Sequence, residues 1–414
     1  MISIDLKNVF FFLESGLSSH VSSKANFAAI GAKRLLLSYG SVSFIYDGDS
    51  WDKQDCNPWD AFETFKKESQ STIFGYLGYD LKNYVEKLSS SNEDVIGAPD
   101  QFWFEPTEQC EWPTDAPMPN VVENYIAKMQ TIDLPQQDFC LLSPGVQEDL
   151  YIKKVQQIQA AIKEGSFYEL NFTRLQTYQN PGLSGWNLYN KMKEVGRVPF
   201  GAFLNLGNGI EVCCASPERF LKKEGKLLVS QPIKGTRSRS VDPSMDKANY
   251  DDLADSEKDQ AENLMIVDLV RNDLNRIAKK GSVSVRDLFT IQAFETVYQM
   301  VSTVQAELDA KYTATEVLKS AFPMGSMTGA PKVEVMKWID KLENYKRGIY
   351  SGAIGYIDTN ENFDFNVVIR TAILKNGLIY YATGGAITSD SNPQSEWHET
   401  VVKSAALEAI FKNK

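Results

Sequence analysis

Apolar residues recur at helical spacing in the segment that follows Asp149, and Gly165 ends this segment. The apolar positions are Ile152, Val155, Ile158 and Ile162. This pattern predicts an amphipathic helix with a glycine terminator. Apolar and polar residues alternate over shorter runs nearer the N-terminus, for example at 41–46 and 73–79, which predicts strands in an aromatic-rich region up to about residue 110.

The rest of the chain predicts strands in adjacent runs, interrupted by single helices. Helices are expected near 184–194, 256–280, 313–321, 331–343 and from about 393, with strands at 168–178, near 200–215, 282–286, 297–307 and between 349 and 383. Such an order favours an α+β fold over a strictly alternating parallel sheet. Four prolines between 106 and 119 predict a boundary near 110–145. We therefore expect an N-terminal β-rich region, 1–120, and a catalytic region, 145–414, which can still form one globular unit.

Composition narrows the class of protein. With 414 residues and 43% hydrophobic content, the chain can bury a large core. It lacks an apolar run of about 18 residues and a basic, apolar leader, which predicts a protein without a membrane anchor or export signal. Five cysteines without a C-x-x-C pair suggest reduced thiols in the cytoplasm. A net charge of -11 without a basic run argues against nucleic acid.

The scarcity of histidine moves attention to carboxylates and lysines. Only His20 and His398 are present. Lys234 stands before a glycine, and a buried, neutral lysine at such a place is a candidate nucleophile. Glu218 closes a strand whose expected hairpin partner carries Lys234, so it is a candidate proton donor. The alternatives are a lysine at a strand end and a surface pair between Glu218 and Arg219.

Two predicted helices each carry carboxylates three residues apart, and therefore on one face. The pairs are Asp259 with Glu262, and Glu396 with Glu399. Four converging carboxylates suit Mg²⁺, which prefers oxygen ligands. The alternative is two solvated helix faces, on which Lys403 forms a routine salt bridge with Glu399.

Three further segments are candidates for binding an anion. The glycine loop 325–332 precedes a helix, and backbone amides at such a place can hold an anion. Gly384 and Gly385 suggest a second short loop of this kind. Arg370 is expected in a strand at 366–373, where an inward arginine needs an anionic partner. A structural turn and an edge-facing arginine are the alternatives.

Together these segments resemble the chorismate-utilising enzymes, which include anthranilate, aminodeoxychorismate, isochorismate and salicylate synthases. The resemblance runs from about 149 to 411. Its motifs are Gly165-Ser-Phe-Tyr-Glu-Leu-Asn, Ser216-Pro-Glu-Arg-Phe, Pro232-Ile-Lys-Gly-Thr, Ala261-Glu-Asn-Leu-Met-Ile-Val-Asp, Gly325-Ser-Met-Thr-Gly-Ala-Pro-Lys, Val368-Ile-Arg-Thr and Glu396-Trp-His-Glu-Thr. It implies an α+β fold with two large antiparallel sheets flanked by helices, and an active site in the cleft between the sheets.

The resemblance is closest to component I of the aminodeoxychorismate synthase branch. Lys234 occupies a position where anthranilate and isochorismate synthases typically carry alanine, and Glu169 one where isochorismate and salicylate synthases carry a lysine. By resemblance, Lys234 attacks C2 of chorismate, Glu218 protonates the departing 4-hydroxyl, and ammonia enters at C4. The expected product is 4-amino-4-deoxychorismate, on the route to 4-aminobenzoate and folate. No glutaminase motif is present, so a separate glutaminase subunit is expected to supply the ammonia.

The resemblance also implies roles for the other candidates. Glu262 and Glu399 would bind Mg²⁺ directly, with Asp259 and Glu396 in support. The implied substrate-binding residues are Arg370, Tyr356, Gly384, Gly385, Thr328, Lys403, Gly235 and Thr236. Anthranilate synthase component I is the first alternative. The second is a non-catalytic chorismate-binding subunit, because Gln299 replaces a frequent histidine of the family. Tryptophan binding by the N-terminal region and the oligomeric state are left open.

Overall fold

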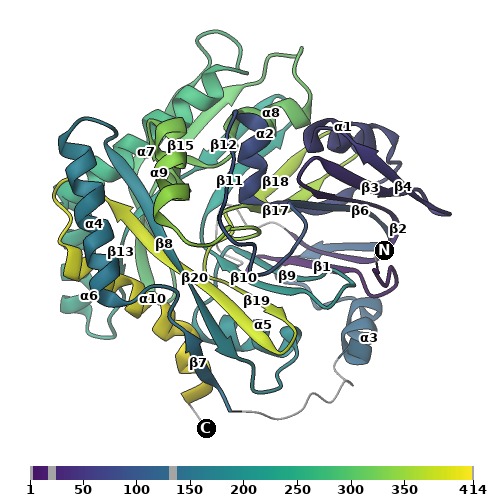
Figure 1. Cartoon of the computed structure of the whole chain (residues 1–414), viewed down its shortest axis with the longest axis horizontal. Coiled ribbons are helices and arrows are strands. Elements are labelled where there is room, and N and C mark those ends of the chain that lie inside the picture. The colour runs from purple at the N-terminus through teal and green to yellow at the C-terminus, as the bar shows by residue number, and fades with distance from the viewer. Residues whose placement is uncertain (1–2, 17–24, 130–137, 413–414) are drawn as a thin grey trace.

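The computed structural model describes residues 3–16, 25–129 and 138–412, so His20 lies outside the described part. The fold is α+β, as predicted, with antiparallel sheet layers flanked by helices (Figure 1). Among the described residues, no helix combines the length and the apolar character that crossing a membrane requires.

The N-terminal region is built around two long strands. Its elements are β1 (Phe10–Glu14), β2 (Ala25–Tyr39), β3 (Val42–Tyr46), β4 (Trp51–Asp55), α1 (Pro58–Glu68), β5 (Ile73–Leu77), α2 (Lys82–Val85), β6 (Gln101–Pro113) and α3 (Asn120–Met129). The alternating pattern predicted only strands before residue 110 and therefore missed α1. This helix begins at Asn57, whose side chain accepts from the Trp59 amide, and it packs Phe62 on Trp103 with ring centroids 4.4 Å apart.

The remaining elements follow α3 along the chain, and most predicted segments are confirmed with shifted ends. They are β7 (Cys140–Ser143), α4 (Glu148–Lys163), β8 (Glu169–Gln179), α5 (Gly185–Val195), β9 (Phe200–Asn205), β10 (Glu211–Ser216), β11 (Arg219–Glu224), β12 (Leu227–Gln231), β13 (Ile233–Ser238), α6 (Pro243–Ala254), α7 (Glu257–Asn275), β14 (Ser284–Ala293), β15 (Val297–Glu307), α8 (Ala314–Ala321), β16 (Gly329–Ala330), α9 (Lys332–Leu342), β17 (Ala353–Ile357), β18 (Phe363–Asn366), β19 (Thr371–Lys375), β20 (Leu378–Ile387) and α10 (Pro393–Lys412).

Strand pairing joins the two expected regions. The antiparallel pairings run in the order β7, β8, β20, β19, β10, β9, β1, β2, β6, β5, β17, β18, β11, β12, β15, and β15 also pairs with β13 and β14. Because β1 pairs with β9 and β5 with β17, the N-terminal strands connect two halves of the catalytic region. Strands β8 and β13 consequently lie near opposite ends of this order.

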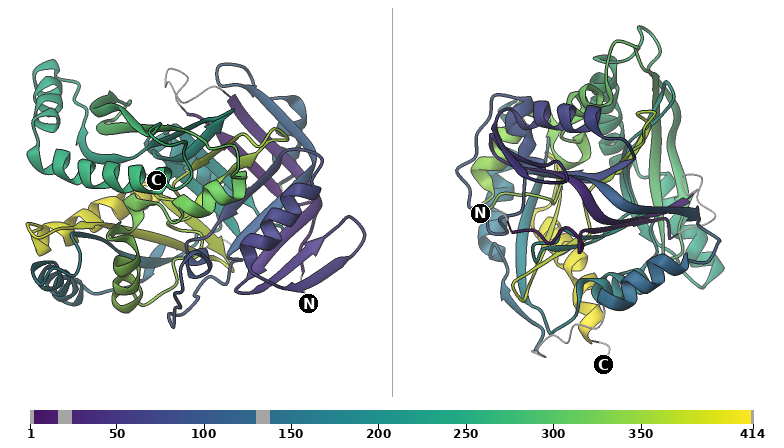
Figure 2. Two further views of the ribbon diagram at one scale, coloured as in Figure 1. Left: turned by 90° about the horizontal axis from the view of Figure 1, so that it is seen from above. Right: turned by 90° about the vertical axis from the view of Figure 1, so that its right-hand side faces the viewer.

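The two helices that carry the acidic pairs, α7 and α10, lie at one end of the molecule together with α4 and α6. Figures 1 and 2 show α4, α6, α7 and α10 at the end opposite the N-terminal strands. Helix α7 packs on β13 and β15, whereas α10 packs on β20. The two acidic pairs are therefore presented by helices that cover opposite ends of the strand order.

Candidate active site

An ion pair between β8 and β13 lies at the centre of the candidate site. Lys234 Nζ donates to Glu169 Oε1 over 2.7 Å, and their side chains are only 10% and 1% exposed. Lys234 was predicted as a candidate nucleophile, and Glu169 was identified as a position where isochorismate and salicylate synthases carry a lysine, but the contact between the two residues was not predicted. Strands distant in both sequence and sheet order thus meet at this lysine.

The charges around Lys234 hold it as an ammonium ion. Burial alone lowers the pKa of this lysine, but the carboxylates of Glu169, Glu262 and Glu218 reverse the effect, and the pKa is raised overall. A lysine attacks carbon only through its neutral amine. Lys234 must therefore lose a proton before it can act as a nucleophile.

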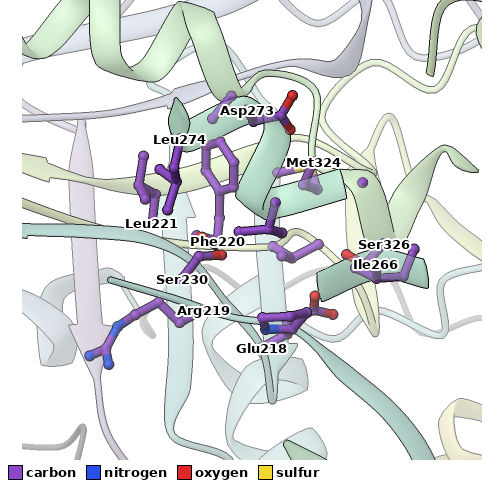
Figure 3. A pocket seen from close by; sticks show the side chains of 15 residues that line it. Glu218, Arg219, Phe220, Leu221, Ser230, Ile266, Asp273, Leu274, Met324 and Ser326 are labelled. Atoms are coloured by element: carbon purple, nitrogen blue, oxygen red, sulfur yellow. Dashed lines mark hydrogen bonds between the residues drawn. The ribbon is translucent and has the colours of Figure 1, made fainter. Parts of the chain in front are cut away.

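Glu218 lies between β10 and β11 and is buried. The expected hairpin was wrong in detail: β11 pairs with β12, and Lys234 follows on β13, which pairs with β15. The two side chains still face each other closely enough to interact electrostatically. Glu218 lines a mostly apolar pocket, and Figure 3 shows its carboxylate there with Ser326 and Ile266 on the same side.

This environment keeps Glu218 protonated near neutrality. Burial raises the pKa of its carboxyl to about 7, although the Ser326 hydroxyl and the Lys234 ammonium favour ionisation. A carboxyl with a pKa near the working pH can donate a proton and be recharged. Glu218 therefore has the properties of a general acid.

Each acidic pair is partly neutralised by a lysine four residues away on its own helix. Lys258 lies 3.7 Å from Glu262, and Lys403 lies 2.6 Å from Glu399. A Cβ on Gly385 would lie 3.3 Å from Glu399 Oε1 and 3.4 Å from Glu396 Oε2, so β20 passes directly beneath this pair. The routine salt bridge expected for Lys403 is confirmed, and Lys403 also donates to the Gly384 carbonyl over 2.7 Å.

Three of the four predicted metal ligands interact electrostatically with the same lysine. Lys258 acts electrostatically on Glu262, Glu396 and Glu399, and burial raises the pKa of both Glu262 and Glu396. Burial opposes ionisation of Glu399 as well, but Lys403 and Lys258 hold its pKa below the usual value. Carboxylates that share a lysine ammonium have the donor chemistry for Mg²⁺.

The fourth predicted ligand points elsewhere. Asp259 accepts from Arg237 over 3.1 Å. Among the described residues, no three His, Cys, Asp or Glu side chains are already arranged as a metal cluster. Glu262, Glu396 and Glu399 therefore share the electrostatic influence of Lys258, whereas Asp259 pairs with Arg237, and the described residues form no closed metal cage.

Two glycines at the site are required by close backbone approaches. Gly235 has φ +79°, and a Cβ there would lie 2.9 Å from Asp259 Cγ, which keeps β13 against α7. Gly329 has φ +143°, and its Cβ would lie 2.0 Å from the Glu169 carbonyl oxygen. Any side chain at either position would push apart the strands and helix that hold Lys234 and Glu169.

The predicted anion-binding segments differ from expectation in conformation. Arg370 is not in a strand: β18 ends at Asn366, β19 begins at Thr371, and Arg370 occupies a bend with φ +51°. Its side chain is exposed, yet the surrounding protein lowers its pKa by desolvation, and no described residue pairs with its guanidinium. Gly384 and Gly385 are not in a loop but within β20, paired with Thr173 and Phe172.

Three residues that were predicted to bind substrate do not present free side chains beside Lys234. Tyr356 packs on Phe27, with ring centroids 4.5 Å apart, and lines a different pocket with Phe200. The Thr328 hydroxyl is buried and donates to the Met324 carbonyl, so it shapes its own loop. Thr236 is an exposed ladder residue of β13. Sequence spacing alone did not reveal which strand face each would occupy.

Comparison with known proteins identifies the family of this chain. The sequence profile of the family described as chorismate binding enzyme matches residues 10–409. Aminodeoxychorismate synthase component 1 of Escherichia coli (strain K12) is 36% identical over 81% of this chain and 75% of that protein. A probable chloroplastic aminodeoxychorismate synthase of Oryza sativa subsp. japonica is 42% identical over 63% of this chain, and this match spans 29% of that longer protein.

Anthranilate synthase component I from Streptococcus pneumoniae TIGR4 shares the fold. It superposes with a TM-score of 0.79 and 25% identity over 94% of this chain and 93% of that one. The family profile covers nearly the whole length described above, including Glu169, Glu218, Lys234, Glu262 and Glu399. This chain belongs to the chorismate binding enzyme family.

Proposed function

We propose that this protein is a synthase that converts chorismate and ammonia into 4-amino-4-deoxychorismate and water. The observation that carries the proposal is the buried Lys234, which faces a carboxyl, Glu218, held near its protonation midpoint. Relatives named aminodeoxychorismate synthase in Escherichia coli and Oryza sativa support the same activity.

The proposed reaction uses the lysine and the carboxyl in sequence. The neutral amine of Lys234 bonds to C2, the ring double bond shifts, and the C4–O bond breaks. Glu218 gives its proton to the departing hydroxyl, which leaves as water. Ammonia then bonds to C4, the double bond shifts back, and the bond between C2 and Lys234 breaks. The amino group is thereby placed at the carbon that lost the hydroxyl.

The charged groups around this centre are suited to the two carboxylates of chorismate. Arg370 is accessible and lacks a partner among the described residues, so it is proposed to bind one of them. Glu262, Glu399 and Glu396 are proposed to hold Mg²⁺ in the space that Lys258 now neutralises. The ion would supply the positive charge that allows a substrate carboxylate to approach these three glutamates.

Removing Mg²⁺ should abolish activity without unfolding the protein. EDTA should lower the rate of chorismate consumption by at least about 10²-fold, because a carboxylate then meets uncompensated glutamates. Added Mg²⁺ should restore the rate. A calorimetric titration of the apoprotein with Mg²⁺ should give one site, and Glu399→Gln should weaken that binding. Full activity in EDTA would contradict the metal assignment.

The decisive experiment identifies the product. The purified chain should be incubated with chorismate, Mg²⁺ and an ammonium salt at mildly alkaline pH, and products separated by chromatography and weighed by mass spectrometry. Aminodeoxychorismate without pyruvate is expected. Anthranilate with pyruvate would instead assign the activity named for the Streptococcus relative. Unchanged chorismate would overturn independent synthase activity and would favour a non-catalytic subunit, unless a partner restores turnover.

A partner that supplies ammonia is part of the proposal. The Escherichia coli relative is named as a component 1, which supports a second component. We propose that this component is a glutaminase, because this sequence carries no motif of such enzymes. Glutamine should then replace ammonium as the nitrogen source only when that component is added.

A further inference from the structure

Glu169 is held more firmly than a salt-bridge partner on a surface would be. It pairs with Ala330 of β16, and the next residue, Leu170, pairs with Gly329 on one side and Ile387 of β20 on the other. The side chain is 1% exposed, and its Oε1 accepts from Lys234 over 2.7 Å. The other oxygen, Oε2, is buried and has no hydrogen-bond partner among the described residues.

Lys234 needs a base, and the groups that face it can be compared. The carboxylates that interact with Lys234 come from Glu169 on β8, Glu262 on α7, Glu218 before β11 and Glu399 on α10. The carboxyl of Glu218, with a pKa of about 7, is assigned as the acid. Glu262 and Glu399 face the proposed Mg²⁺. Glu169 is the carboxylate whose hydrogen bond to Nζ is already formed.

We propose that Glu169 is the proton acceptor for Lys234, taking the proton from Nζ when chorismate binds and returning it when Lys234 leaves C2. This inference rests on the proposed function. In the first step the N–H bond of the ammonium breaks and an O–H bond forms on Glu169, so an ion pair becomes a neutral amine and a neutral acid. In the last step the proton returns, and the original ion pair is restored.

Burial makes this transfer accessible. An ion pair in a low-dielectric site pays a large desolvation cost, whereas the neutral pair does not. Substrate binding removes the remaining water around Lys234 and therefore favours the neutral pair. The second oxygen of the Glu169 carboxyl, Oε2, has no hydrogen-bond partner among the described residues. It can therefore accept a hydrogen bond from another donor while Oε1 carries the proton.

The test compares Glu169→Gln with wild type across pH, using kcat/KM for chorismate at a fixed concentration of free ammonia. The ratio of kcat/KM between variant and wild type reports the contribution of residue 169, because the ionisation of Glu218 changes kcat/KM of both proteins alike. Glutamine keeps the volume but cannot take a proton, so Lys234 must lose its proton to solvent. The ratio should be about 10⁻² at pH 7 and should rise about tenfold per pH unit towards pH 9.

Control variants separate the proton transfer from packing. Glu169→Asp keeps an acid at a changed distance, so its ratio should be lowered but independent of pH. Glu14→Gln removes another Lys–Glu pair, with Lys193 at 2.5 Å, whose glutamate also accepts from the Tyr189 hydroxyl over 2.6 Å, and its ratio should stay near one. Thermal unfolding establishes that each variant is folded. A Glu169→Gln ratio that does not change with pH would overturn the proposal, as would an Asp ratio with the same slope.

The outcome also distinguishes the two proposals from each other. If Lys234→Arg is inactive and the Glu169→Gln ratio is flat, the lysine remains the nucleophile and only the role of Glu169 fails. If Lys234→Arg keeps wild-type activity, covalent catalysis by the lysine fails, and the proton-acceptor role fails with it.

Discussion

Lys234→Arg should lower the rate of product formation by about 10³-fold or more while leaving the protein folded, because it removes the nucleophile and keeps the charge. Arginine stays protonated at every accessible pH, so it can pair with Glu169 but cannot attack C2. The measurement is the rate of aminodeoxychorismate formation with ammonium, followed by chromatography, together with the urea midpoint.

Lys234→Ala provides the matched comparison. It should be equally inactive but less stable, by about 3 kcal/mol or more if Glu169 keeps its buried charge. An active Ala variant that makes the same product would exclude the covalent path.

Glu218→Gln should produce the second large effect, lowering kcat by about 10²- to 10⁴-fold, because an amide cannot protonate the departing hydroxyl. In the wild type, activity should decline above about pH 7 as the Glu218 carboxyl ionises. The variant should lose this alkaline limb. A variant that retains wild-type kcat and pH profile would show that another group is the acid.

The same substitution should stabilise the fold at alkaline pH. The ordinary pKa of a glutamate carboxyl is 4.5, whereas the pKa of Glu218 in the folded protein is about 7, so between these values the native state binds more protons than the unfolded state. Wild-type stability therefore falls as pH rises through this window, by up to about 3 kcal/mol. The Glu218→Gln variant lacks this pH-dependent loss of stability. Its free energy of unfolding in urea, relative to that of the wild type, should therefore increase from pH 4.5 to 7 and then stay constant. A constant difference would contradict the raised pKa.

The fold class and most elements of the catalytic region followed from local pattern. The helix of α4 was visible because its apolar residues face one side and a glycine ends it. Helix α1 was missed because its capping residue and proline read as a loop beside short strands. Strand ends were less predictable: the bend at Arg370 depends on a positive φ that no local preference for arginine would suggest.

Candidate residues that belong to sequence motifs could be predicted, whereas contacts between strands far apart in the sequence could not. Lys234, Glu218 and the two acidic pairs were predicted as candidates from residue type and spacing, and the structure brings Lys234 within electrostatic reach of Glu218, Glu262 and Glu399. The partner of Lys234 was not, because the contact with Glu169 depends on how β8 and β13 meet in space. Tyr356 was placed by motif, but the pleat of β17 turns it towards Phe27 in another pocket.

The strand order has a consequence for how the protein folds. Glu169 and Lys234 are separated by 65 residues, and their strands lie near opposite ends of the pairing order. Contacts between segments far apart in the sequence tend to form late in folding, because the entropy cost of closing the loop precedes the stabilising free energy of the contact. We therefore expect the Lys234–Glu169 pair to form only when the folded sheets bring β8 and β13 together, so a chain that has collapsed without completing its sheets would carry both residues and lack their contact.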